Sequence, residues 1–441
     1  MLISKRKRYL SGSDWVINTL DHMMKATTCA RNMSQVVLVL DGLLDESEVR
    51  SRLNAFVKQF PVLQGRVRRD IKLAPYWKIP VKAVGDITFT AEQADEPMSG
   101  GTRLTYFEKS ANTPFQNNNE HVAFHLMSDR GRSMLAMTFD HRIFDARGAE
   151  MFLDLFQRSV KSGPSTVSGD IAFTSSSALT RWSKKFLAGR NVNRRIMTLS
   201  KTSAPRALPL PVGGARGYRY RLLSFNEQET AGIYERAYNE AGYLMESSYL
   251  LSVIIQSMHD LFTGKEMAGA SYLIPVTMDL RPGLDPIQEI FFNYVSYLFY
   301  QVPIEKVDDR APLIALLKQQ MYDQVKAGFP RDLAEASLLT RIAPLSLLGK
   351  LLHLPMKGKM ATFAFSHLGK SSYSSTGFMG QRIENLFHMP RVPVPPGIGF
   401  FSNLFNGRLN IVISHLDGLL QEDEVETLEA GIKKRFGLGL A

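Results

Sequence analysis

Cysteine is nearly absent from this chain of 441 residues, which contains only Cys29. A single cysteine forms no internal disulfide, and neither a C-x-x-C nor an H-E-x-x-H motif is present to bind a metal ion. We therefore expect no metal site and no permanently bound cofactor. Nothing in the cysteine content indicates an oxidising compartment.

Long apolar runs are lacking as well. No uninterrupted apolar segment reaches the roughly 18 residues that a membrane-spanning helix needs. The basic residues at the start of the chain are not followed by the apolar stretch of a signal peptide. The sequence therefore predicts a cytoplasmic protein, and leaves open a peripheral contact with a membrane.

Acidic residues are missing from positions 171–226, where lysine and arginine account for the whole formal net charge of +11. Such a segment attracts phosphate groups or anionic lipid, although a solvated linker has the same composition. Residues 338–360 are apolar and basic, which suits a membrane surface or the rim of a lipid tunnel as well as ordinary packing. Nucleic acid is disfavoured as a partner, because few aromatic residues lie among the basic ones.

The pattern of apolar residues predicts two α/β lobes, and the length suits two cores of about 200 residues each. We expect an N-terminal lobe over residues 1–165, a basic crossover linker over 166–217 and a C-terminal lobe over 218–441. In the first lobe we expect a strand at 35–40, a helix at 46–60, a hairpin of strands at 121–127 and 134–139, and a helix from 149. In the second lobe we expect helices at 247–262, 311–327 and 422–436 and strands at 269–276, 294–302, 362–366 and 409–414.

A short sequence echo links the two ends of the chain. Residues 40–49 read LDGLLDESEV and residues 416–425 read LDGLLQEDEV. Both segments follow an apolar strand, turn at Asp-Gly and enter a helix with acidic residues in its first turn. Either the two lobes are structural copies with these turns in corresponding places, or the same turn-and-cap chemistry has arisen twice.

The segment that carries chemistry is residues 138–148, which read TFDHRIFDARG. His141 leaves a predicted buried strand, and Asp145 opens the helix that follows. Imidazole takes up and returns a proton near neutral pH, and an alcohol or amine must lose a proton as it attacks a thioester. By composition alone, however, a histidine at a strand end is more often structural than catalytic.

Other candidate groups are weaker. No covalent intermediate is expected, because Cys29 lies in the N-terminal segment and no G-x-S-x-G elbow is present. His121 and His125 share a strand face, but as a metal pair with His141 they lack an evident fourth ligand. His415 ends a predicted strand and is expected at a surface or an interface.

Four stretches together resemble a known group of enzymes. They are the His-x-x-x-Asp motif at 141–145, residues 14–68 with their Phe-Pro-x-Leu-x-x-Arg ending, residues 274–282 (IPVTMDLRP), and residues 365–369 (FSHLG). On these residues the chain resembles the superfamily of CoA-dependent acyltransferases and condensation enzymes. That group includes chloramphenicol acetyltransferase, wax ester synthase/diacylglycerol acyltransferases and the condensation domains of peptide synthetases. The resemblance implies two similar chloramphenicol-acetyltransferase-like lobes, each a mixed sheet with helices, and an active-site tunnel between them.

The resemblance also implies roles for single residues. His141 becomes the general base, and Asp145 becomes a structural anion that pairs with Arg281. Two positions depart from the pattern, because Asp140 stands where a second histidine often precedes the motif and Ala146 replaces the motif glycine. Asp140 and Ala146, with Asn293 and Ser366, are the candidate tunnel or substrate-contacting residues.

The function implied is transfer of an acyl group from acyl-CoA or an acyl carrier protein, through its phosphopantetheine thioester, to a hydroxyl or amine. Basic and apolar stretches near the expected tunnel favour a hydrophobic acceptor. Two alternatives stay open. One is a standalone condensation enzyme for carrier-bound acyl groups, and the other is a non-catalytic relative that binds a thioester or a protein partner.

Overall fold

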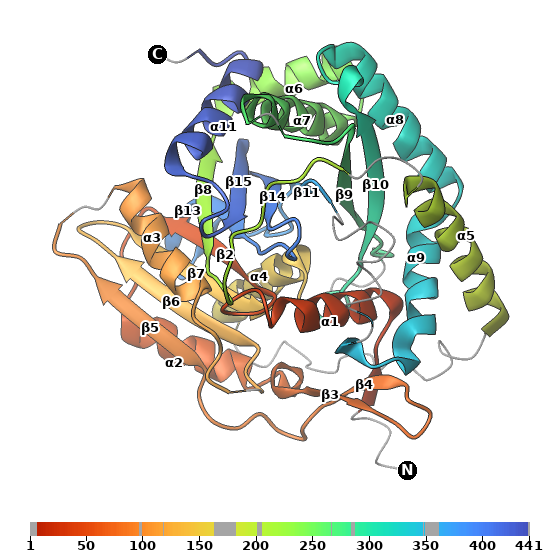
Figure 1. Cartoon of the computed structure of the whole chain (residues 1–441). Coiled ribbons are helices and arrows are strands. Elements are labelled where there is room, and N and C mark those ends of the chain that lie inside the picture. The colour runs from red at the N-terminus through yellow and green to blue at the C-terminus, as the bar shows by residue number, and fades with distance from the viewer. Residues whose placement is uncertain are drawn as a thin grey trace.

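The chain folds into two lobes, each centred on a six-stranded mixed sheet, as the sequence predicted (Figure 1). The structure is a computed structural model that describes residues 7–96, 99–117, 119–162, 182–200, 205–265, 267–283, 287–346, 348 and 361–439. A third, smaller sheet has the order β1-β4-β3 and consists of β1 (Lys7–Tyr9), β4 (Pro75–Lys78) and β3 (Arg66–Arg69).

The sheet of the N-terminal lobe has the order β12-β13-β2-β7-β6-β5. Its strands are β2 (Met33–Leu40), β5 (Thr88–Gln93), β6 (Val122–Ser128), β7 (Ser133–Asp140), β12 (Gly377–Phe378) and β13 (Gln381–Met389). Helices α2 (Glu46–Val57) and α4 (Ala146–Ser162) cover one face through a cluster of aromatic rings that includes Phe56 and Phe152. Helix α3 (Gly100–Ala111) packs on the other face, because its Phe107 lies in one core cluster with Val37 and Ala136.

The sheet of the C-terminal lobe has the order β10-β9-β11-β14-β15-β8. Its strands are β8 (Tyr218–Ser224), β9 (Ser271–Asp279), β10 (Val295–Pro303), β11 (Ala364–Lys370), β14 (Ile398–Phe405) and β15 (Arg408–Leu416). Its helices are α6 (Glu227–Ala241), α7 (Glu246–Gly264), α8 (Arg310–Lys326) and α11 (Glu422–Arg435). Helix α7 is buried at every residue from Ser248 to Met258, including its serines and Gln256, so this stretch has no solvated face.

The remaining helices lie at the side of the molecule where the lobes meet (Figure 1). Helix α1 (Gly12–Met24) packs against α9 (Phe329–Ser337), and α9 packs along α5 (Trp182–Ser200). Three short 3-10 helices complete the described structure: η2 (Pro61–Gln64), η5 (Ile304–Lys306) and η6 (Leu338–Ile342). None of the helices in the described ranges combines the length and apolarity that crossing a membrane requires.

Two sets of four strands show that the lobes have related topology. In the first lobe β2, β7, β6 and β5 pair in turn as antiparallel, antiparallel and parallel neighbours. In the second lobe β8, β15, β14 and β11 repeat these three pairings in the same order. A helix follows the equivalent strands in each lobe, since α2 and α6 follow β2 and β8, and α4 and α11 follow β7 and β15.

This equivalence corrects the interpretation of the sequence echo. Both segments join a strand to a helix, as predicted, but LDGLLDESEV follows β2 whereas LDGLLQEDEV follows β15. The equivalent of β15 is β7, so the two segments occupy different places in the repeat. Their similarity therefore reflects shared turn-and-cap chemistry, and the first-lobe turn that matches LDGLLQEDEV is the one that contains His141.

The predicted domain boundaries also need correction. Strands β12 and β13 lie inside the expected C-terminal lobe of residues 218–441, yet they complete the N-terminal sheet, where β13 pairs with β2. The expected linker of residues 166–217 is not purely a connection, because it contains the 19 residues of α5. Residues 163–181, 201–204 and most of 338–360 lie outside the described residues, so the structure does not test the expectations for those parts.

Candidate active site

The loop after β7 places His141 between the lobes. Strand β7 is buried along its whole length, and α4 begins at Ala146, so the motif spans a short exit from the sheet. The backbone N–H of His141 donates to the carbonyl of Asn32 at 3.1 Å. Phe144 forms a bridge with Phe292 of the opposite lobe, and the Phe292 N–H donates to the Ile143 carbonyl at 2.5 Å.

The segment that faces the motif has a strained backbone at Phe292. Its φ of 75° lies in the left-handed region, which a bulky side chain rarely adopts and which costs about 1–3 kcal/mol. The Phe292 ring is buried, and the Arg8 guanidinium lies 3.5 Å from its centre. These contacts hold the turn, and the turn presents Asn293 to His141.

Asn293 fixes the orientation and the tautomer of His141. Its Nδ2 donates to the carbonyl oxygens of His141 at 2.9 Å and Arg142 at 3.4 Å. Its Oδ1 therefore faces Nδ1 of the His141 ring at 3.2 Å, so the proton lies on Nδ1. In the neutral ring this arrangement leaves the lone pair on Nε2, which is the form that a general base requires.

Asp145 connects the lobes, and it pairs with Arg281 as predicted. Its carboxylate also accepts hydrogen bonds from the backbone N–H groups of Gly148 at 2.9 Å and Tyr294 at 3.1 Å. Burial disfavours the charge of Arg281, but Asp145 and Asp279 raise the pKa of its guanidinium above the usual value. Arg281 therefore keeps its charge, and its ion pair with Asp145 holds the motif against the C-terminal lobe.

Asp140 does not line the cavity, so its expected contact with substrate is wrong. It is buried beneath the motif, where it accepts hydrogen bonds from His121 Nδ1 at 2.9 Å and Arg142 at 2.5 Å. Burial opposes the charge of Asp140, but Arg142 and His121 hold the pKa of its carboxyl well below the usual range. Asp140 thus stabilises the loop that carries His141.

His121 and His125, which the sequence offered as a weak metal-binding pair, form hydrogen bonds within the protein instead. Nε2 of His121 lies 2.8 Å from the Gly65 carbonyl, and Nδ1 of His125 lies 2.8 Å from the Thr90 hydroxyl. Neither approaches His141 as a co-ligand, and no cluster of three metal-binding side chains occurs among the described residues.

Ala146 is compatible with the fold, because it is the first residue of α4 and does not have a positive φ. The glycine that the fold requires lies two positions later. A Cβ on Gly148 would collide with the carbonyl oxygen of Ile290, so only glycine fits there. The Ala146 methyl group instead lines the cavity next to His141.

A narrow cavity of about 120 Å³ lies between the lobes beside His141. It brings together the predicted residues His141, Asp145, Ala146, Arg281 and Ser366, whereas Asn293 holds the His141 ring from behind. Residues that sequence reasoning did not assign to it are Ser34, Phe139, Arg147, Thr277, Met278, Asp279, Val295, Tyr297, His367, Leu368, His388, Pro390 and Phe401.

Two further histidines therefore share the wall of this cavity with His141. Nδ1 of His367 lies 2.8 Å from the Ser402 hydroxyl, and burial lowers the pKa of His367 to about 4, so this ring is neutral at pH 7. Nε2 of His388 lies 2.7 Å from Oε1 of Glu150. The segment at 365–369 drew attention in the sequence, but no local pattern marked His388.

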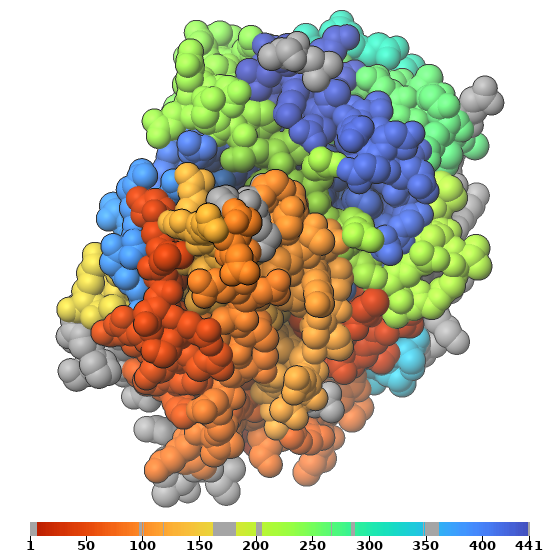
Figure 2. Space-filling view, turned by 90° about the vertical axis from the view of Figure 1, so that its left-hand side faces the viewer, coloured from red at the N-terminus to blue at the C-terminus, as the bar shows by residue number. Residues whose placement is uncertain are grey.

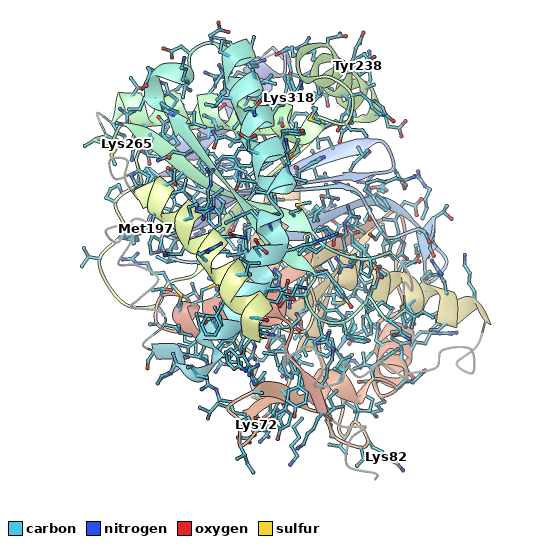
Figure 3. The ribbon with its side chains drawn as sticks, turned by 90° about the vertical axis from the view of Figure 1, so that its right-hand side faces the viewer. Lys72, Lys82, Met197, Tyr238, Lys265 and Lys318 are labelled. Carbon is cyan, nitrogen blue, oxygen red and sulfur yellow. The ribbon has the colours of Figure 1, made fainter. Side chains whose placement is uncertain are left out.

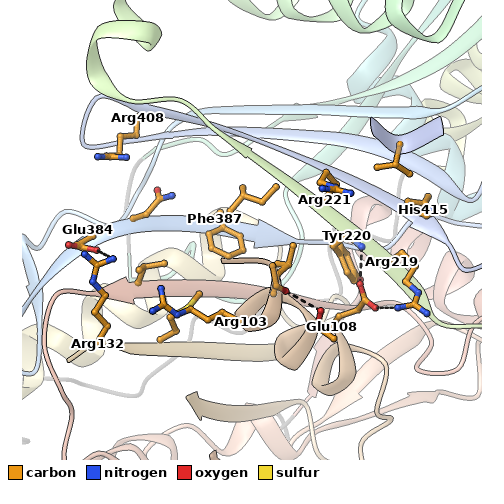
Figure 4. A pocket seen from close by; sticks show the side chains of 18 of the residues that line it. Arg103, Glu108, Arg132, Arg219, Tyr220, Arg221, Glu384, Phe387, Arg408 and His415 are labelled. Carbon is orange, nitrogen blue, oxygen red and sulfur yellow. Dashed lines mark hydrogen bonds and ion pairs between the residues drawn. The ribbon is translucent and has the colours of Figure 1, made fainter. Parts of the chain in front are cut away.

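A much larger groove of about 1510 Å³ lies on another side of the molecule and does not include His141 (Figure 2). It runs between α3, β7 and β13 on one side and β8 and β15 on the other (Figure 4). His415, which we expected at a surface or an interface, lines this groove and is buried. Its charges largely neutralise one another, as in the Arg219–Glu108 pair at 2.8 Å and the Arg132–Glu384 pair at 3.5 Å. The groove is larger than the His141 cavity, but among its described lining residues it offers no comparable set of catalytic groups.

Comparison with known proteins identifies the fold. No protein-family model and no curated protein sequence matches the chain. Among solved structures, a trichothecene 15-O-acetyltransferase from Fusarium sporotrichioides is 11% identical, with a TM-score of 0.73, and the match covers 98% of this chain and 95% of that one.

Condensation domains of peptide synthetases also have similar structures. The first condensation domain of the CDA synthetase is 13% identical with a TM-score of 0.72, over 99% of this chain and 96% of that chain. The starter condensation domain of rhizomide synthetase, solved with C8-CoA and Leu-SNAC, is 10% identical with a TM-score of 0.66, over 98% and 94%. The chain therefore has the fold that these condensation domains share with the acetyltransferase.

Proposed function

We propose that the protein is an acyltransferase that moves an acyl group from a thioester to a hydroxyl or amine, with His141 as the general base. The observation that carries this proposal is the His141 ring, whose Nδ1 donates to Asn293 and whose Nε2 is free within the described residues beside the cavity. Nε2 takes the proton of the acceptor as the acceptor oxygen or nitrogen bonds to the acyl carbon. The carbon–sulfur bond then breaks, and the thiolate receives that proton.

The fold supports this reaction class. The similar proteins include an O-acetyltransferase and a condensation domain bound to C8-CoA. We propose acyl-CoA or a carrier-bound phosphopantetheine thioester as the donor and an acceptor with a hydrophobic skeleton. Aromatic side chains on the cavity wall, among them Phe139, Tyr297 and Phe401, suit such a skeleton.

The second candidate is a standalone condensation enzyme. It is favoured by the similarity to the starter condensation domain, which was solved with the amino-acid thioester Leu-SNAC. This candidate predicts an amine acceptor and a carrier-bound or SNAC-bound substrate. Alcohol turnover with no amine turnover would exclude it.

We also propose a peripheral contact with anionic membranes through α5. This helix lies on the surface along α9, and its exposed side chains include Phe186, Leu187, Arg190, Arg194 and Met197 (Figure 3). Helix α5 contains no acidic residue. Basic and apolar side chains on one exposed surface are typical of helices that lie at a membrane interface.

Turnover of acyl-CoA with a panel of alcohols and amines tests the proposed function. The substitution His141→Ala should lower kcat by about 10²–10⁴-fold, because this is the usual contribution of a general base. The melting temperature should change little, because the ring faces a cavity and Asn293 is its one side-chain hydrogen-bond partner among the described residues. A variant that keeps full activity, or a wild type that is inactive with every acceptor, would contradict the proposal and leave a non-catalytic thioester-binding protein.

A further inference from the structure

Two polar side chains on the cavity wall, Ser34 and His388, take no part in holding His141. Both are buried, with 4% and 5% of their surface exposed. Within the described residues, the buried Ser34 hydroxyl has no hydrogen-bond partner. The hydrogen bond of the His388 ring to Glu150 is made by Nε2, which leaves Nδ1 available for a ligand. Unpaired buried polar atoms are rare in proteins unless a ligand or water pairs with them, so this part of the wall has the character of a binding site.

The strand register places Ser34 and His388 on one face of the sheet, near the end of β7 that leads into His141. Strand β2 lies between β7 and β13, with Ser34 opposite Phe139 and Val36 opposite His388. Residues directly opposite each other share a face of a sheet, so Ser34 and His388 lie on the same face as Phe139. Strands are about 4.8 Å apart, so Ser34 is one strand from β7 and His388 is two. An atom deprotonated by His141 lies within about 3 Å of it, so His388 faces a remote part of the substrate.

The hydrogen bonds of His388 determine which kind of ligand group can bind beside it in the cavity. The buried Glu150 carboxylate accepts the Nε2–H of His388 at 2.7 Å and the backbone N–H of Ser372 at 2.5 Å. A proton held on Nε2 leaves the lone pair of the neutral ring on Nδ1, and the Ser34 hydroxyl both donates and accepts. A hydroxyl group can donate to Nδ1 and accept from Ser34 at the same time, whereas a carboxylate has no proton to donate.

The charges around the cavity also favour a neutral group. Arg281 pairs with Asp145, and Arg147 lies 3.1 Å from Asp279. Each cation on the wall thus has a carboxylate partner, and no described cation there is left to bind an anion. His367 is neutral at pH 7, because burial lowers its pKa to about 4.

We propose that Ser34 and His388, with His388 oriented by Glu150, anchor a second hydroxyl group of the acceptor. The acceptor is then an alcohol or amine with a hydrophobic skeleton that carries a further hydroxyl remote from the reacting atom. This inference rests on the proposed acyl transfer and names its acceptor class. A site built to bond a hydroxyl discriminates strongly against an analogue that lacks it, because its buried groups are then left unpaired.

Acceptors with one carbon skeleton test the anchor. Octan-1-ol is compared with octanediols that carry the second hydroxyl at increasing separation, with acyl-CoA as the donor. For the wild type, kcat/KM should be about 10- to 100-fold higher for one of the diols. Ser34→Ala and His388→Gln should reduce this ratio to about 1, since glutamine keeps a donor for Glu150 but loses Nδ1.

Ser271→Ala is the matched control. Ser271 is also a buried serine whose hydroxyl has no partner among the described residues, but it does not line the cavity, so both rates should stay as in the wild type. Calorimetric titration with the preferred diol measures its affinity in the absence of turnover. Ser34→Ala should bind this diol more weakly than the wild type does. Equal kcat/KM for alcohol and diols, or an undiminished ratio in Ser34→Ala, overturns the anchor. A wild type that transfers no acyl group to any acceptor instead overturns the proposed function itself.

Discussion

At the scale of residues, the site is built from imidazole rings that each have one nitrogen bound by the protein. Asn293, Ser402 and Glu150 hold His141, His367 and His388, and in each ring the other nitrogen remains free within the described residues. The partner differs in each case, so the rings present different nitrogens and hydrogen-bonding groups to the cavity.

The ion pair between Asp145 and Arg281 gives a stability prediction. Both side chains are largely buried, and Arg281 has a second partner in Asp279 at 3.1 Å. Asp145→Asn leaves the guanidinium with that weaker, more exposed partner, so the free energy of unfolding should fall by about 3 kcal/mol, near the low end for buried pairs. Urea titration measures this loss. The exposed pair of Arg50 and Glu46 is the control, since Arg50→Gln should change stability by about 0.5 kcal/mol or less. An equal effect of both substitutions would contradict the assigned role.

His125 predicts a dependence of stability on pH. Burial lowers its pKa from 6.5 to about 4, so the unfolded chain binds a proton more readily than the folded one. Stability is therefore complete above pH 6.5 and falls as the pH drops towards 4. At pH 5 this group alone should cost about 2 kcal/mol relative to pH 7. Unfolding free energies at pH 7 and pH 5 should differ less in His125→Asn than in the wild type. Equal differences would show that His125 is not buried as a neutral ring.

The sequence could predict those site residues that a local motif or the family resemblance marks. His141, Asp145 and Arg281 were predicted, and the structure brings them to one cavity. His388 was not predictable, because its partner Glu150 lies 238 positions away and the strand that carries it shows no alternating pattern. Ala146 drew attention as a missing glycine, whereas the packing constraint acts on Gly148.

At the scale of elements, part of the basic segment of residues 171–226 folds into helix α5. Its residues Ala188 and Val192 pack towards α9 with Phe329, while Arg190 and Arg194 are exposed. Arg195 is a different case, because it is half-buried and donates to the Phe299 carbonyl at 3.1 Å. An electrostatic contact made by α5 therefore depends on the exposed arginines and not on Arg195.

This arrangement predicts binding to anionic vesicles. The wild type should sediment with phosphatidylserine vesicles at low salt and progressively less as salt rises, because exposed charges are screened over about 8 Å at physiological ionic strength. Reversing Arg190 and Arg194 to glutamate should lower the affinity at least about 10-fold, since each basic residue near such a surface contributes about 1 kcal/mol. Neutral vesicles are the control. Binding that ignores salt and both reversals would refute the contact and favour a solvated helix.

The pairing of β6 with β7 could be predicted from the sequence, whereas pairings between distant strands could not. The hairpin of β6 and β7 was predicted, because its two strands are adjacent in the sequence and are both apolar. Strand β13 escaped prediction, because its neighbour is β2, and the Arg382–Asp41 contact beside this pairing spans 341 positions. The apolar pattern specifies that a segment is buried, but not which sheet buries it.

At the scale of the whole molecule, the cavity exists only because the lobes exchange structure. Strand β13 of the second half completes the first sheet, and the largest core cluster contains Val37 and Ala136 together with Ile274 and Phe400. His141 is held by Asn293, and Asp145 by Arg281, from the opposite lobe. The cavity beside His141 therefore belongs to neither half alone.

This exchange predicts that the two halves of the chain cannot fold independently, although length and composition suggest two separate cores. A fragment of residues 1–217 lacks β13, so β2 becomes an unpaired, apolar edge strand of the kind that aggregates. We expect this fragment to be insoluble when expressed alone, because the residues of the second half that share a core cluster with Val37 and Ala136, among them Ile274 and Phe400, are also missing. Co-expression with residues 218–441 should restore a soluble complex with acyltransferase activity, measured after co-purification through a tag on one fragment. A monomeric, cooperatively unfolding fragment 1–217 would show that the N-terminal sheet is stable without β13.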